Sequence, residues 1–125
     1  MTRIGREAFS GCKNLTTVVI PNSVTAIDRG AFYLCSSLSS LTLSNSLESI
    51  GNNAFQDCTG LTSITIPVSV KSIGEYAFNG CSSLASITVP YGVTSIGGFA
   101  FNGCARATTV LALERRTWKS MLSVL

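Results

Sequence analysis

The chain has 125 residues, of which 46% are hydrophobic and only 12% are charged. A chain of this length and apolar content can bury a core, which excludes an intrinsically disordered protein. The net charge of +3 comes wholly from residues 106–119 and is far too small for the basic surface along a face that binds nucleic acid, so no nucleic-acid partner is expected. No apolar run approaches the roughly 18 residues of a membrane-spanning helix, so no transmembrane segment is expected. No signal peptide is recognised in this chain either.

Single residue types recur through the chain at a constant interval, on every 23rd position. Five phenylalanines and five cysteines keep this step: Phe9, Phe32, Phe55, Phe78 and Phe101, and Cys12, Cys35, Cys58, Cys81 and Cys104. A fixed period between about 20 and 50 residues is typical of a solenoid, in which each unit contacts only its neighbours. We therefore predict a repeat array over residues 1–113, of about five 23-residue units, with equivalent side chains stacked on one another.

Each unit contains one segment typical of a β-strand. Residues 61–66 end in alternating apolar and polar residues and are rich in β-branched side chains. Pro67 ends the strand because proline cannot donate to a β-ladder. Stacking would produce a parallel sheet with one short strand per unit, at about residues 18–20, 41–43, 64–66, 87–89 and 110–112.

The rest of the unit returns the chain to the next strand. Ile73, Ala77, Phe78 and Cys81 have a spacing that predicts one short helical turn against the core. Asn79-Gly80 would end this turn in left-handed backbone geometry. One further inward position falls at Val24, Leu47, Val70 and Val93. The sequence leaves open whether this position belongs to a second, minor strand.

The pattern L-x-x-I-x-I-P followed by V-x-x-I-G-x-x-A-F-x-x-C resembles the BspA-type leucine-rich repeats over roughly residues 2–113. The resemblance implies an α/β repeat solenoid. This is a right-handed, gently curved coil whose parallel sheet lines the concave face and whose short helical turns lie opposite. It also implies a cell-surface or secreted protein that adheres to host or matrix proteins.

The residues do not point to an enzyme or to a cofactor. The cysteines lie one full repeat apart instead of in the short C-x₂₋₄-C pairs of zinc sites, and the chain has no histidine. Adjacent coils would place the cysteines roughly 4.8 Å apart, which favours a ladder of buried free thiols. Acidic residues are scattered over the repeat, and no G-x-S-x-G nucleophile elbow is present. We therefore expect a non-enzymatic protein.

The outward strand positions form the candidate binding site because they carry hydroxyl groups unit after unit. They are Thr17, Ser40, Thr42, Ser63, Thr65, Ser86 and Thr88. One interpretation is a recognition surface for a protein partner. The other is duplication of polar, strand-forming residues, since the surface lacks the Trp, Tyr and Arg of most hot spots. A hydroxyl lattice is also typical of ice-binding solenoids, although a concave sheet fits a flat crystal face poorly.

The two ends of the array differ. Residues 114–125 have the i, i+3, i+4, i+7 apolar spacing of an amphipathic helix, which would cap the last coil or dock on a partner or a membrane surface. The residues for either role are Arg115, Arg116, Trp118, Met121, Leu122 and Leu125. The first coil has no cap, which favours self-association through its open edge. The sequence thus leaves two functions open: an adhesion module, or a structural scaffold or linker subunit docked through its ends.

Overall fold

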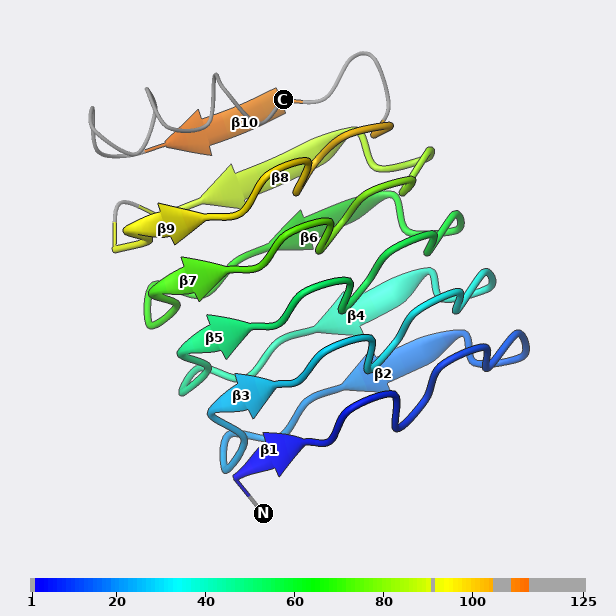
Figure 1. Cartoon of the computed structure of the whole chain (residues 1–125), viewed down its shortest axis with the longest axis horizontal. Helices are drawn as coiled ribbons and strands as arrows, with labels where there is room; N and C mark the ends of the chain where they lie inside the picture. Colours follow the sequence, from blue (N-terminus) through cyan, green and yellow to red (C-terminus); the bar gives the residue numbers. More distant parts are fainter. Residues whose placement is uncertain (1, 91, 105–108, 113–125) are drawn as a thin grey trace.

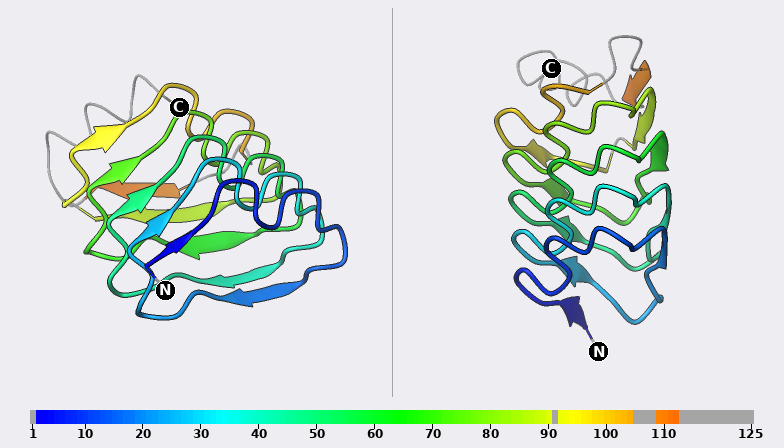
Figure 2. Two further views of the ribbon diagram at one scale, coloured as in Figure 1. Left: turned by 60° about the horizontal axis from the view of Figure 1, so that its bottom comes forward. Right: turned by 90° about the vertical axis from the view of Figure 1, so that its right-hand side faces the viewer.

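A computed structural model describes residues 2–90, 92–104 and 109–112, the last four as backbone. The chain forms a solenoid of stacked coils, each with a longer strand on one side and a two-residue strand on the other (Figure 1). The coils follow one another along a single, nearly straight axis (Figure 2). The predicted repeat solenoid with a parallel sheet is therefore confirmed.

The longer strands form the major side of the solenoid. They are β2 (Thr17–Val19), β4 (Ser40–Thr42), β6 (Ser63–Thr65), β8 (Ser86–Val89) and β10 (Thr109–Ala112). Each begins one residue before the predicted segment. Every paired residue lies one repeat period from its partner, as in Ser63 with Ser86 and Ile64 with Ile87. The register of the sheet therefore equals the period of the sequence.

The short strands form a continuous parallel sheet on the minor side. They are β1 (Arg3–Ile4), β3 (Ala26–Ile27), β5 (Ser49–Ile50), β7 (Ser72–Ile73) and β9 (Ser95–Ile96). A minor strand thus exists, but it carries the recurring isoleucine instead of Val24 and its equivalents. Val70 lies in a turn, where its N–H donates to the carbonyl of Pro67 (3.1 Å). The minor strand, which the sequence left open, thus lies two to three residues after the valine position.

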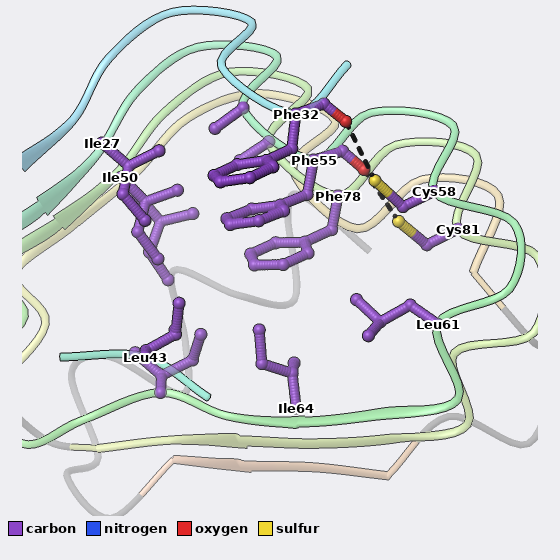
Figure 3. Close-up of a cluster of buried hydrophobic side chains, with 14 of the residues drawn as sticks. Ile27, Phe32, Leu43, Ile50, Phe55, Cys58, Leu61, Ile64, Phe78 and Cys81 are labelled. Atoms are coloured by element: carbon purple, nitrogen blue, oxygen red, sulfur yellow. Dashed lines mark hydrogen bonds between the residues drawn. The ribbon is translucent and has the colours of Figure 1, made fainter. Parts of the chain in front are cut away.

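The core is a column of identical side chains. The rings of Phe32 and Phe55 stack with centroids 5.2 Å apart and planes inclined by 3°, and Phe55 and Phe78 stack at 5.3 Å (Figure 3). Leu61 and Ile64 close the column from the major side and are buried. Phe9, in the first coil, stacks on Phe32 but remains 39% exposed. The predicted phenylalanine ladder is confirmed.

The edge that joins the minor strand to the next major strand consists of consecutive β-turns. In residues 74–81, the N–H of Ala77 donates to Gly74 and that of Cys81 to Phe78, both three residues back. Tyr76 and Gly80 have positive φ angles of 59° and 77°, typical of the third residue of a type II turn. The N–H of Phe78 instead donates to the carbonyl of Ala100 in the next coil (2.8 Å).

This alternation explains why the predicted helical turn does not form. An α-helix needs successive N–H groups to bond within the segment, whereas here alternate N–H groups bond to the neighbouring coil. No α-helix occurs among the described residues, and none of these residues forms a helix able to cross a membrane. The predicted helix at residues 114–125 lies outside the described part of the chain.

Candidate binding surface on the major sheet

The outward residues of β2, β4, β6 and β8 define one surface, which we call the sheet face. Alternation along each strand turns Ile64 and Ile87 into the core and their neighbours outward. Six of the seven predicted hydroxyl residues are exposed and Thr88 is half-buried. The structure thus places Thr17, Ser40, Thr42, Ser63, Thr65, Ser86 and Thr88 on a common surface.

These hydroxyl groups are free to bind. Hydroxyls elsewhere in the repeat are used within the protein: Thr25 donates to the carbonyl of Thr2 (3.0 Å), and Thr94 to that of Lys71 (3.3 Å). Within the described chain, none of the seven sheet-face hydroxyls bonds to another protein group. Each can both donate and accept a hydrogen bond toward a ligand.

The major sheet is interrupted between β4 and β6. β2 pairs with β4, and β6 with β8 and β10, but β4 and β6 belong to separate sheets in the described structure. The same two coils stay joined elsewhere. β5 pairs with both β3 and β7, and the N–H of Phe32 donates to the carbonyl of Ala54 (2.8 Å). The coils therefore separate only on the side of the sheet face.

A cleft of about 360 Å³ lies at this interruption. Its lining combines three predicted hydroxyl residues with apolar strand residues and one amide: Leu41, Thr42, Leu43, Asn45, Ser63, Ile64, Thr65 and Pro67. Leu41 is only half-buried, whereas Ile87, its equivalent two coils later, is buried. The gap thus exposes part of the apolar interior beside the hydroxyls.

The cleft offers hydrogen bonds without charge, because none of its lining residues is ionisable. Strand backbone groups that would pair between β4 and β6 face the gap instead. Backbone N–H and C=O groups, hydroxyls and a small apolar area are the groups that recognise a peptide or another neutral polar chain. The arrangement is therefore suited to binding.

Sequence reasoning missed part of this site. Thr42, Ser63 and Thr65 were predicted, but Leu41, Asn45, Ile64 and Pro67 were not among the predicted binding residues. The available signal was Ser44, which stands two residues after the end of β4, at the position where three other units carry Pro21, Pro67 and Pro90. The Ser44 side chain is buried and donates to the carbonyl of Val24 (2.8 Å), so its hydroxyl is satisfied.

The cysteine ladder lies inside the coils, away from the sheet face. All five cysteines are free; Cys35, Cys58 and Cys81 are buried and the end members Cys12 and Cys104 are half-buried. Desolvation by burial raises the pKa of Cys58 to about 12, and the neighbouring Cys35 adds to this shift. Burial also raises the pKa of Cys81 and, to about 11, that of Cys104. These thiols therefore stay protonated at neutral pH and fill space, as the sequence predicted.

The repeat identifies the family. Residues 2–116 match the family described as "BspA type Leucine rich repeat region", in six copies. The chain belongs to the BspA-type leucine-rich repeat family. None of the curated proteins matches it.

Several solved structures are similar to this BspA-type chain. A leucine-rich repeat protein of T. pallidum is 35% identical, with a TM-score of 0.86 over 88% of this chain and 51% of that protein. A leucine-rich cell surface protein of Faecalibacterium prausnitzii is 32% identical, with a TM-score of 0.88 over 99% of this chain and 32% of that protein. A leucine-rich repeat protein from Eubacterium ventriosum is 31% identical, with a TM-score of 0.77 over 89% of this chain and 29% of that protein. The chain thus spans about half, or less, of the length of these proteins.

Proposed function

We propose that the chain is a non-enzymatic, protein-binding module of an adhesion protein at the cell surface, and that it binds through the sheet face. The observation that carries this proposal is the set of hydroxyls without a protein partner, gathered around the cleft between β4 and β6. Cell-surface placement is supported by the Faecalibacterium protein, which is described as a cell surface protein.

The chemistry of the sheet face suits a neutral partner surface. Its outward positions carry hydroxyls and, in the first coil, Val19, which is 69% exposed. A partner that presents backbone groups or uncharged polar side chains could satisfy the hydroxyls while Val19 and Leu41 supply apolar contact. A charged partner surface would lose hydration here without gaining an ion pair.

The test is a triple substitution, Thr42→Glu, Thr65→Glu and Thr88→Glu, on three successive coils. Binding would be measured against a panel of purified extracellular-matrix and host-surface proteins. Carboxylates on the outward positions would remain hydrated in the folded protein but would bury unpaired charge in a complex. We expect capture by the wild-type chain and its loss in the triple variant.

A matched control carries the same charges away from the sheet face. Ser36, Thr59 and Ser82 are exposed, occupy the same position in three successive repeats and lie outside the strands. Replacing all three by glutamate creates an equivalent ladder of three carboxylates, with the same repulsion between coils. Circular dichroism would verify folding of both variants. Equal binding by the sheet-face variant and this control would exclude the sheet face as the binding surface.

A scaffold function is supported by a different observation. In the first coil Phe9 is 39% exposed, and β1 and β2 are edge strands in the described sheets. Exposed apolar surface and strand edges of this kind can stack on a further coil, on a second copy or on an assembly subunit. If capture survives the sheet-face substitutions but disappears when residues 114–125 are removed without unfolding, the chain docks through its ends instead.

A further inference from the structure

Three arginines gather in the first two coils, on the side of the minor sheet. Arg6 and Arg29 are separated by one repeat period and so occupy the same position in successive coils. The N–H of Glu7 donates to the carbonyl of Arg29 (3.0 Å), which joins the two coils beside both arginines. Their Cα atoms are therefore one strand spacing, roughly 4.8 Å, apart. Arg3 precedes Arg6 by three residues.

The positive charge of this cluster is only partly neutralised. Arg3 forms an ion pair with Asp28 (Nη1 to Oδ2, 3.2 Å). Neither Arg6 nor Arg29 makes an ion pair or a side-chain hydrogen bond with any residue that the structure describes. Two like charges in adjacent coils repel each other, and an anion between them would relieve this repulsion.

The arginines border a hollow of about 450 Å³. Its lining is Arg3, Arg6, Ile27, Asp28, Arg29, Ser49, Gly51 and Asn52. Ser49 adds a hydroxyl donor. The Oδ1 of Asn52 accepts the N–H of Glu75 (2.9 Å), which leaves the Nδ2 donors of Asn52 for a ligand. The hollow therefore offers three guanidinium groups and two neutral donors, against one carboxylate that is already paired.

The hollow continues into a trough along the minor sheet. Ser49, Gly51 and Asn52 also border a second depression of about 350 Å³, which reaches Ser72, Gly74 and Ser95 and has a single charged residue, Glu75, in its lining. A Cβ atom on Gly74 would lie 2.5 Å from the backbone N of Asn52, so close stacking of the coils keeps the floor free of side chains. A ligand can therefore place an anionic group at the arginines and an uncharged polar body over the serines.

We propose that Arg6 and Arg29, with Arg3, form a binding site for a tetrahedral oxyanion, the sulfate or phosphate group of an ester. Guanidinium groups bind such oxygens through paired, charge-assisted hydrogen bonds. The site is lined by residues of β1, β3 and β5, whereas the sheet face belongs to the longer strands, and the two rows of strands lie on opposite sides of the coils (Figure 2). If the anion-binding proposal fails, the proposed protein-binding function of the sheet face is therefore unaffected.

The test measures binding of four probes to the full chain by isothermal titration calorimetry. The probes are a heparin-derived sulfated oligosaccharide, its desulfated counterpart, inorganic sulfate and inorganic phosphate. We expect the sulfated oligosaccharide to bind, the desulfated one not to bind, and the affinity to fall as salt is raised. If inorganic sulfate or phosphate binds as tightly as the sulfated oligosaccharide, the site binds the free anion. If the oligosaccharide binds clearly more tightly, the site recognises the anionic group of an ester.

The decisive comparison uses two variants with equal net charge. Arg6→Gln/Arg29→Gln removes two charges from the cluster, and Lys13→Gln/Lys71→Gln removes two from exposed lysines that do not line the hollow. Arg6 and Arg29 are exposed, so the first variant should fold, which circular dichroism would verify. We expect about tenfold weaker binding for the cluster variant and no change for the other. Unchanged binding by the cluster variant, equal loss in both variants, or no binding of any anion by the wild-type chain would overturn the proposal.

Discussion

The thiol of Cys58 donates a hydrogen bond to the backbone carbonyl of Phe32, in the preceding coil, at 3.2 Å (Figure 3). Cys81 makes the same bond to Phe55 at 3.1 Å. Because donor and acceptor lie 26 residues apart, one period plus three positions, each thiol links its own coil to the phenylalanine of the preceding coil. The two most regular residues of the sequence are thus joined in a single buried network.

Replacing Cys58 by alanine should destabilise the fold by about 1–3 kcal/mol. The substitution removes one of the two donors to the carbonyl of Phe32, which keeps the N–H of Cys35 (3.2 Å), and opens a small cavity beside the phenylalanine column. Urea unfolding followed by circular dichroism would measure the effect. Cys12→Ala is the matched control, since Cys12 is half-buried in the first coil. Equal losses for the two variants would contradict a stabilising role for the thiol bond.

The thiols should also make the fold sensitive to alkali. Burial raises the pKa of Cys58 from its ordinary value of 9.0 to about 12. Between these values the unfolded chain loses the thiol proton while the folded chain keeps it. The contribution of the thiol to the free energy of unfolding is therefore fully present below pH 9. It declines as pH rises toward 12, by about 1.4 kcal/mol per pH unit for each such thiol. Unfolding free energies measured from pH 8 to 11 should fall less steeply in Cys58→Ala/Cys81→Ala than in wild type.

Alanine substitutions in the phenylalanine column should destabilise the fold most at the centre of the column. Phe55 is fully buried between two rings, so Phe55→Ala should cost roughly 3–5 kcal/mol. Phe9 stacks on one ring and is 39% exposed, so Phe9→Ala should cost well under half as much. Thermal unfolding of both variants tests this order. A larger loss at Phe9 would mean that another molecule covers the first coil.

Two glycines in successive coils should respond in opposite ways to alanine. A Cβ on Gly74 would lie 2.5 Å from the backbone of Asn52 in the preceding coil, and backbone atoms cannot move away without separating the coils. Gly74→Ala should therefore cost about 1–3 kcal/mol. A Cβ on Gly98 meets nothing within 4 Å, so Gly98→Ala should be neutral or stabilise by up to about 1 kcal/mol. Similar melting temperatures for the two variants would contradict the close packing of coils at Gly74.

The features that repeat follow from the order of the amino acids alone. When Ser63 and Ser86 occupy the same position in successive units, each has the same neighbours, so the repeat period dictates the register, the phenylalanine column and the thiol ladder. The outward direction of Thr42 and Thr65 follows from the same alternation. Whether these hydroxyls bind a partner stays a prediction, as does the role of Trp118 and residues 114–125.

The features that depend on contacts between coils could be read only from the fold. The spacing of Ala77 and Cys81 fits a helical turn as well as it fits β-turns, and the outcome depends on N–H groups such as that of Phe78 bonding to the next coil. The cleft between β4 and β6 arises where one coil differs from its neighbours. The meeting of Arg6 with Arg29 follows from their shared repeat position, but the hollow beside them also takes in Asn52 of a third coil. A repeat pattern describes what the coils share. The cleft and the hollow combine residues that differ between coils, so they can be recognised only from the positions of those residues in space.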